Sequence, residues 1–209
     1  MLDKLVGLVS GLAVAACSVV GIRSGTEEPA YRVIAHVGAV EIREYGERLA
    51  AETAVEGDEM AARSTGFRRV AGYIFGANKS QAKIAMTAPV AQASEKIAMT
   101  APVAQERDAQ GRWVIQFYMP AEYTRETLPE PTDPLVRIVS VPKQTLGVLR
   151  FSGVPTGTSV ADETAELMTA LENSSWKPAG QPFAWFYDPP WTLPPLRRNE
   201  VVVAVTDSK

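Results

Sequence analysis

Few side chains in this sequence could do chemistry, and the first is its single histidine. His36 is the only imidazole among 209 residues, so any metal ligand or general base of that type must be this residue. There is no second histidine for a metal pair, no Gly-x-Ser-x-Gly motif and no glycine-rich phosphate loop. Met86 and Met99 carry thioethers, which can ligate iron but more often fill cores. These residues indicate binding rather than catalysis.

A second set of side chains that could bind a ligand lies on one predicted helix. Over residues 58–75 apolar side chains recur with the helical period, and Gly76 is suited to end the helix. Gly66 and Gly72 inside it cost about 1 kcal/mol each relative to alanine, which indicates close packing or a ligand there. An apolar stripe bordered by arginines suits a flat apolar ligand with carboxylates, although an ordinary amphipathic helix shows the same pattern. The stripe and its border comprise Met60, Arg63, Phe67, Arg68, Ala71 and Ile74.

A ten-residue segment after this helix occurs twice. KIAMTAPVAQ occupies residues 83–92 and again residues 96–105. Its larger apolar side chains alternate, as in a strand with one buried face. Pro89 and Pro102 lack the N–H that a central strand needs, so each belongs at an edge, a strand end or a bulge. The pattern predicts two short strands joined near residues 93–95.

The first half of the chain surrounds the helix with strands. One long strand is predicted over residues 31–45, with a bulge or kink at Gly38 where the apolar parity changes. A second is predicted over residues 49–55, and another over residues 113–119 after a polar hairpin loop at 105–112. The prolines of residues 123–134 then indicate a linker between halves.

The second half repeats this order. Strands are predicted at residues 135–141 and 144–151, a helix at 160–173, and strands at 183–187 and 200–205. Thr158 and Ser159 are the N-cap candidates of the helix. Both halves together predict an α+β fold, in which a duplicated strand-helix-strand-strand unit curls around one core.

A proline-dense segment, YDPPWTLPPLRRNEV at residues 187–201, closes the second half. Its restricted backbone predicts a rigid surface corner that presents Trp191, Arg197 and Arg198. Alternatively, the corner is purely structural: the tryptophan packs over the core and one of the arginines pairs with a nearby carboxylate. In that case the corner holds no site.

The first 17 residues differ from the rest. Their apolar run is shorter than the roughly 20 residues that cross a bilayer, so residues 1–17 are interpreted as a secretory signal. The four residues that end at Cys17 resemble a bacterial lipobox, in which the cysteine is lipidated and becomes the N-terminus. Ser18 favours the outer membrane by analogy with sorting in Gram-negative bacteria. Residues 18–30 would be a polar tether, which places the protein in the cell envelope, facing the periplasm.

The composition of the chain is that of one ordinary globular domain. With 46% hydrophobic and 22% charged residues and a net charge of -3, residues 31–206 suffice for a substantial core. No run of Lys and Arg exceeds two residues, which argues against a nucleic-acid partner. A single cysteine excludes an intrachain disulfide.

Four blocks in a fixed order resemble the SOUL haem-binding protein family. They are GFRRVAGYIFGANK at residues 66–79, KIAMTAPV, WVIQFYMP at residues 113–120, and the corner from PPW to RRNEV. The resemblance implies a distorted antiparallel β-barrel flanked by two helices, with haem or a related tetrapyrrole in a pocket on the first helix and the strands beside it. It leaves open whether His36 ligates the iron. The N-terminal export segment and the doubled block depart from the best-known animal members.

Two alternatives to reversible haem binding remain open. The duplicated unit also resembles the GyrI-like small-molecule-binding fold, some of whose members bind drugs and a few of which hydrolyse small molecules. A buried carboxylate with a raised pKa in the pocket would favour that alternative. The other is a structural envelope protein.

Overall fold

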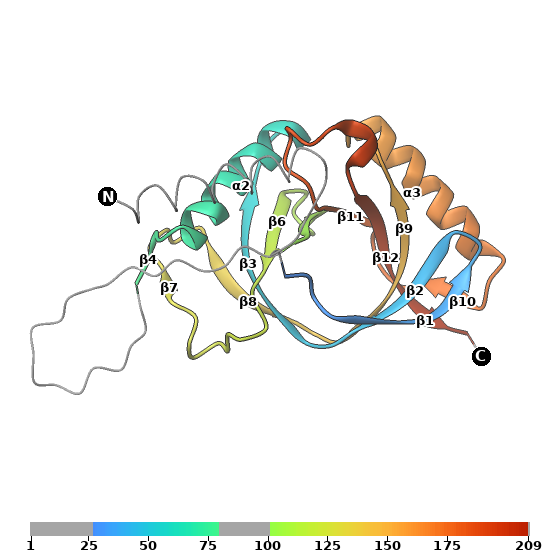
Figure 1. Ribbon diagram of the computed structural model, residues 1–209, viewed down its shortest axis with the longest axis horizontal. Helices are drawn as coiled ribbons and strands as arrows, with labels where there is room; N and C mark the ends of the chain where they lie inside the picture. The colour runs from blue at the N-terminus through green and yellow to red at the C-terminus, as the bar shows by residue number, and fades with distance from the viewer. Residues whose placement is uncertain (1–26, 80–100, 209) are drawn as a thin grey trace, which may run out of the picture.

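The computed structural model describes residues 27–79 and 101–208. Two helices pack against one large antiparallel sheet, which confirms the predicted α+β class (Figure 1). Neither helix within the described residues is long and apolar enough to cross a membrane. The elements are β1 (Tyr31–Val37), β2 (Val40–Tyr45), β3 (Arg48–Val55), α2 (Glu59–Ile74), β4 (Asn78–Lys79), β5 (Val103–Arg107), β6 (Trp113–Tyr118), β7 (Glu130–Pro131), β8 (Arg137–Val141), β9 (Gln144–Phe151), α3 (Gly157–Glu172), β10 (Trp176–Pro178), β11 (Phe183–Phe186), the short 3-10 helix η1 (Pro194–Leu196) and β12 (Asn199–Asp207).

The strand order contains the predicted duplication. Hydrogen bonds connect the strands in the order β1-β2-β9-β12-β11-β5-β6-β3-β8, with β10 on β12, while β4 and β7 form a separate pair. The set β3, β6 and β5 is matched by β9, β12 and β11, and the two sets meet where β5 pairs with β11. Helix α2 lies over β3 and β6, and α3 over β9 and β12.

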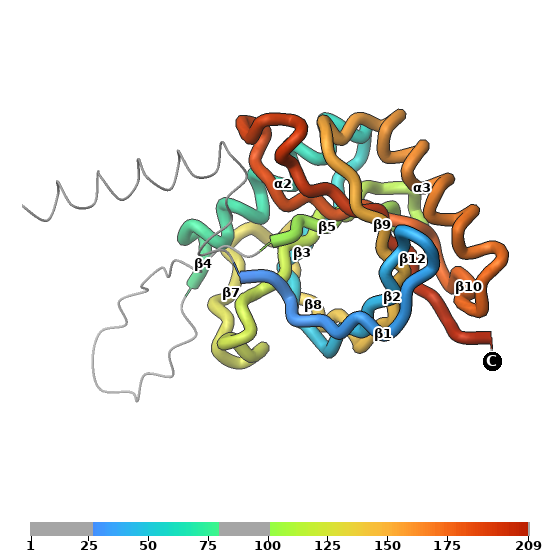
Figure 2. The backbone as a smooth tube through the Cα atoms, turned by 45° about the vertical axis from the view of Figure 1, so that its right-hand side comes forward, coloured from blue at the N-terminus to red at the C-terminus, as the bar shows by residue number. Residues whose placement is uncertain are grey.

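Besides the pairing of β5 with β11, the two halves are joined by the pairing of β2 with β9 and of β3 with β8. β2 pairs with β9 through Tyr45 and Gln144, and β3 pairs with β8 through Arg48 and Val141, so one register continues across both tight turns. Figure 2 shows the sheet curling around on itself, with β1 and β2 across the ring from β3. The hydrogen-bonded order still has two ends, β1 and β8, so among the described residues the sheet is not a fully hydrogen-bonded barrel.

The single strand predicted over residues 31–45 is wrong. Val37 pairs with Val40, and Gly38 starts a two-residue hairpin turn with a φ of 58°. Glycine adopts this left-handed conformation without the Cβ clash that other residues meet. The register shift lies instead between Val33 and Ala35.

The helix boundaries are close to those predicted. Asp58 caps α2 by accepting the amide of Ala61 at 3.0 Å. Helix α3 starts at Gly157, earlier than predicted, and its cap is Thr156 rather than Thr158 or Ser159. The Thr156 hydroxyl accepts the Ser159 amide at 3.1 Å, and the Ser159 hydroxyl accepts the Thr156 amide at 3.0 Å. This capping box gives the Ser159 amide an acceptor at the start of the helix and adds a second acceptor for the Thr156 amide, which also donates to the Val154 carbonyl at 2.9 Å.

Three apolar clusters fill the molecule. One lies under α2 and includes Ile74, Ile115 and Phe117, and one lies under α3 and includes Leu167 and Leu171. The third lines the inner face of the curled sheet: Tyr45, Ala50, Ala101, Ala104, Tyr118, Leu146, Val148, Trp185, Tyr187 and Val202. Because successive side chains of a strand point to opposite faces, each central strand supplies side chains both to a cluster under a helix and to the inner cluster.

Gly66 and Gly72 differ in their surroundings. A Cβ on Gly66 would lie 2.4 Å from Cγ1 of Ile115, so α2 touches β6 at this point. A Cβ on Gly72 would meet nothing within 4 Å. Close packing, the first explanation offered by the sequence, therefore applies to Gly66 alone.

Candidate functional site

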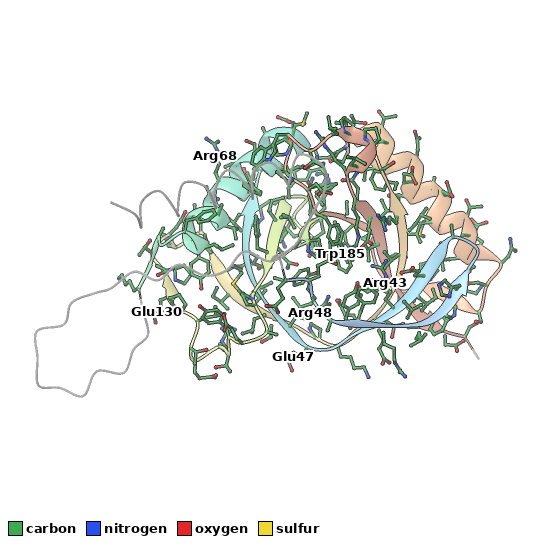
Figure 3. The ribbon with its side chains drawn as sticks, viewed as in Figure 1. Arg43, Glu47, Arg48, Arg68, Glu130 and Trp185 are labelled. Carbon is green, nitrogen blue, oxygen red and sulfur yellow. The ribbon has the colours of Figure 1, made fainter. Side chains whose placement is uncertain are left out.

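Three of the predicted residues form an exposed flank on α2, here called the α2 flank: Met60, Phe67 and Arg68. Met60 is 71% exposed and Phe67 is 43% exposed, although the Phe67 ring also lies 5.2 Å from that of Phe117. The Arg68 side chain projects from the helix into solvent, with only a 3.4 Å contact from its Nε to the Ser64 carbonyl (Figure 3). This flank offers apolar contact beside a cation.

Arg63 is engaged within the protein. Its Nε donates to Oε1 of Gln105 at 2.5 Å and its Nη2 to Oε1 of Glu59 at 2.6 Å, while Nη1 donates to the Pro155 carbonyl at 3.0 Å. The guanidinium also lies 4.3 Å from the centre of the Phe186 ring. Burial lowers the pKa of Arg63, and the charge of Glu59 partly opposes this effect. The side chain fastens α2 to β5 and to the loop before α3.

The remaining predicted residues on α2 belong to the core. Ile74 is fully buried in the cluster under the helix, and Ala71 is almost buried. They support the α2 flank from below rather than face a ligand.

His36 lies apart from α2. It is exposed near the tip of the β1–β2 hairpin, opposite Glu41, whereas α2 lies on the other side of the molecule (Figure 1). Within residues 27–79 and 101–208, no three His, Cys, Asp or Glu side chains gather as a metal site would require. Met86, Met99 and Cys17 lie outside the described residues.

A cavity of about 290 Å³, here called the inner-face cavity, opens on the inner side of the sheet. Glu52 on β3, Gln116 on β6 and Glu106 on β5 occupy inward positions that apolar residues hold elsewhere on these strands. Tyr118 and Phe183 supply aromatic walls, and the remaining lining residues are Val139, Ser140, Val141, Pro142 and Gln144.

The two carboxylates of this cavity have different surroundings. Glu52 accepts hydrogen bonds from Nε2 of Gln116 and Nη2 of Arg137, each at 2.8 Å. Glu106 has no hydrogen-bond or ion-pair partner among the described residues. Burial raises the pKa of Glu106, and the nearby charge of Glu52 raises it further. A carboxylate with a raised pKa in a cavity is the feature expected of a small-molecule pocket, and Glu106 has it.

A larger cavity of about 610 Å³ adjoins the first, between α3 and the paired strands β5 and β11. Glu106 and Phe183 line both cavities. The α3 wall is formed by small side chains, Val160, Ala161, Thr164 and Ala165, and Trp113 on β6 also lines the cavity.

A buried ion network occupies another part of the inner face. Glu200 is fully buried and accepts hydrogen bonds from Arg43, from Arg198 and from the Tyr187 hydroxyl, the last at 2.6 Å. Burial alone would lower the pKa of Arg43, but the hydrogen bonds and charge of Glu200 outweigh it and the pKa is raised. Burial and the charge of Glu200 both raise the pKa of Tyr187. In this network two guanidiniums and one hydroxyl share a single buried carboxylate, so its role is structural.

The proline corner, residues 187–201, contributes Arg198 to this network. Arg198 pairs with Glu200 and with Glu28, at 2.9 and 3.0 Å, and Arg197 donates to the carbonyls of Thr192 and Pro190. The structural interpretation, in which one of the arginines pairs with a carboxylate, holds for Arg198, whereas Arg197 contacts backbone carbonyls. Trp191, which that interpretation places over the core, is instead 62% exposed. Glu28, assigned to the tether from the sequence, contacts the folded part through this pair.

The cavity residues were not predicted from the sequence. Glu106 was expected in a polar loop that starts at Gln105, whereas β5 continues through Glu106 and Arg107. The available signal was parity, because Glu106 follows Ala104 by two positions and so shares its inward face. Glu52 and Gln116 likewise stand at inward positions, which only the pairing of β3 with β6 reveals.

A curled sheet with two helices, an internal cavity and an adjoining one is typical of a ligand-binding domain. A family model described as SOUL heme-binding protein matches residues 26–204, so the chain belongs to the SOUL haem-binding family, as the motifs predict. Heme-binding protein 2 of Mus musculus and that of Homo sapiens are each 30% identical over 135 residues, covering 64% of this chain. The match spans 62% of the length of these relatives.

Solved structures share the fold at low identity. The C-terminal domain of EcmrR has a TM-score of 0.59 at 12% identity, covering 85% of this chain and 98% of that domain. EcmrR in a DNA complex gives 0.57 at 11% identity, covering 99% of this chain and 67% of EcmrR. A hydrolase from Listeria innocua gives 0.50 at 11% identity, covering 88% and 94%. These likenesses concern the fold alone.

Proposed function

We propose that this protein binds haem or a related tetrapyrrole reversibly, without turnover, for sequestration or transfer at the cell envelope. The observation that carries the proposal is the SOUL haem-binding family match over residues 26–204. In this proposal the curled sheet acts as a distorted antiparallel β-barrel flanked by two helices, and it serves as a rigid support for the ligand.

The α2 flank is the proposed haem site. Haem is a flat apolar disc with two carboxylates on one edge, so it needs apolar contact beside a cation. Met60 and Phe67 provide exposed apolar contact, and Arg68 is available for a propionate because its only described contact is weak. Arg63 takes a positioning role, since its hydrogen bonds to Gln105 and Glu59 fix the N-terminal turns of α2.

Axial ligation by His36 is not part of the proposal. Its place on the β1–β2 hairpin separates the imidazole from the α2 flank (Figure 1). Hemin binding in His36→Ala should therefore match that of the wild type in affinity and in Soret position. Loss of the Soret shift in His36→Ala would place the haem at β1 instead.

The decisive experiment is a hemin titration of the soluble form that begins at Ser18, followed at the Soret band against a strong apoprotein acceptor. Saturation at one equivalent is the criterion, because apolar surfaces also take up hemin loosely. The variants Phe67→Ala and Arg68→Gln should each weaken binding about tenfold, which corresponds to loss of one aromatic contact or one charged hydrogen bond.

Matched controls separate this site from general surface effects. Ile34→Ala removes a comparably exposed apolar side chain on β1, away from α2, and Arg150→Gln removes an exposed arginine on β9. Both should bind hemin like the wild type. Absence of one-to-one saturation in the wild type would remove the proposed function.

Membrane anchoring through Cys17 is the second part of the proposal, and the lipobox-like sequence that ends at this residue supports it. A Cys17→Ser variant of the full chain should move from the membrane fraction to the soluble fraction and lose incorporation of labelled fatty acid. Unchanged fractionation would contradict the anchor without touching the proposed haem site.

A further inference from the structure

The inner-face cavity is chemically distinct from the α2 flank. Its lining comes from β3, β5, β6, β8, β9 and β11 and the turn after β8, whereas α2 covers the other face of β3 and β6. At about 290 Å³ it corresponds to roughly ten water volumes of about 30 Å³ each, which is the lower end of the usual range for ligand pockets. A ligand there is therefore a small molecule.

The charge of the cavity favours a cation. Among its lining residues the charged ones are Glu52 and Glu106. Arg137 reaches Glu52 from the rim at 2.8 Å and compensates that carboxylate. Glu106 has no cation within ion-pair distance among the described residues, so its carboxylate lacks a counter-ion beside the cavity. A positive ligand would supply the missing charge.

The walls favour an organic cation over a hydrated metal ion. Phe183 and Tyr118 face the same space, and a ring face attracts alkylammonium and guanidinium groups. The aromatic interior already accommodates one such group: the Arg48 guanidinium lies 4.5 Å from the ring centre of Tyr45 and 4.8 Å from that of Tyr118. Figure 3 shows Arg48 within the curled sheet, below Trp185.

We propose that the inner-face cavity binds a small organic cation of the alkylammonium class, with Glu106 as its counter-ion and Phe183 and Tyr118 as its aromatic walls. Glu52, held by Gln116 and Arg137, shapes the polar end of the site. This site is independent of the proposed haem site.

Choline and its neutral isostere 3,3-dimethylbutan-1-ol test the proposal, because the two differ in charge and hardly in shape. Isothermal titration of the soluble form should give one choline site with a Kd at least tenfold lower than that of the alcohol. Glu106→Gln should reduce choline affinity at least tenfold and leave the alcohol unchanged. Glu47→Gln, which removes an exposed carboxylate at the β2–β3 turn, should change neither (Figure 3).

Two outcomes would overturn the proposal: equal affinities for choline and the alcohol, or choline affinity that survives Glu106→Gln. Circular dichroism of Glu106→Gln verifies that the variant is folded. Hemin titration of the same variant, and choline titration of Phe67→Ala, should both be like the wild type. These crossed controls keep failure of the cation site separate from failure of the proposed haem site.

Discussion

The contact between Gly66 and Ile115 gives a prediction whose sign can be worked out from the structure. An alanine Cβ at position 66 would lie 2.4 Å from Cγ1 and 2.9 Å from Cβ of Ile115, so α2 or β6 must shift. Overpacking of this kind costs about 1 to 3 kcal/mol, and the better helix propensity of alanine returns about 1 kcal/mol. Gly66→Ala should therefore lower the free energy of unfolding by about 1 kcal/mol, within a range of roughly 0 to 2 kcal/mol.

Gly72→Ala is the matched control on the same helix. It carries the same propensity gain and meets nothing within 4 Å, so it should raise the free energy of unfolding by about 1 kcal/mol. The difference between the two variants isolates the contact with Ile115 and should amount to about 1 to 3 kcal/mol.

Urea unfolding of the soluble form measures the free energy of unfolding of both variants. In thermal unfolding, each 1 kcal/mol should move Tm by about 2 to 4 °C for a chain of this size. In the double variant Gly66→Ala, Ile115→Ala the loss should be smaller than the sum of the single losses, because the second substitution removes Cγ1. Equal stability of Gly66→Ala and Gly72→Ala would refute the assigned packing of α2 on β6.

Three further predictions concern the inner face and the repeat. The folded-state pKa of Glu106 is raised, so its favourable contribution is complete below the unfolded pKa of about 4.3 and is lost as the pH rises through the folded value. In urea unfolding, the free energy of unfolding of Glu106→Gln should accordingly equal that of the wild type at pH 3.5 and exceed it at pH 8. A difference in this free energy that is the same at both pH values would contradict the prediction. Glu200→Gln leaves the guanidiniums of Arg43 and Arg198 buried without their shared counter-ion, so it should lower the free energy of unfolding by about 3 to 5 kcal/mol. The control Glu47→Gln should leave this free energy unchanged. Deletion of residues 83–95 keeps one copy of the repeat and shortens the connection from Lys79 to Ala101 from 21 residues to 8. The lower entropy cost of closing the shorter connection should raise the free energy of unfolding by roughly 0.9 kcal/mol. A large decrease in the free energy of unfolding would instead show that the deleted copy packs against the fold.

Local patterns predicted most elements, and long-range pairing accounts for what they missed. The helical period of apolar side chains in α2 and the cap at Asp58 both depend on neighbouring residues, so they are local features of the sequence. The hairpin at Gly38 could not be told from a kink, because both use a glycine where the apolar parity changes and only the pairing of Val37 with Val40 distinguishes them. The start of α3 depends on a side-chain pair, Thr156 with Ser159, that several nearby hydroxyls could have formed.

The candidate site shows the same limit. The helical period placed Met60 and Phe67 on one flank, as the structure does, but it could not show that Ile74 turns into the core. Nor could it show that Arg63 is engaged by Gln105, which lies 42 residues away. The inward carboxylates became visible only once β3, β5 and β6 were paired.

Strand β5 connects the two proposed sites, and its sequence explains why the second copy of the repeat forms it. Gln105 faces α2 and holds Arg63, while Glu106 faces the inner cavity. The two copies are identical over ten residues, so nothing inside the repeat favours either one. The preference must come from the residues that follow. The first copy continues into Ala93 and Ser94, and the second into Glu106 and Arg107.

Arg107 and the turn after it fasten the second copy in place. The Arg107 guanidinium lies 4.0 Å from the centre of the Trp113 ring, and Asp108 caps the turn by accepting the amide of Arg112 at 2.9 Å. A first copy in this position would set Ser94 opposite Trp113 and lose both contacts. It would also put Ala93 where Glu106 stands and so remove the carboxylate on which the cation site depends. Choline affinity therefore reports which copy forms β5.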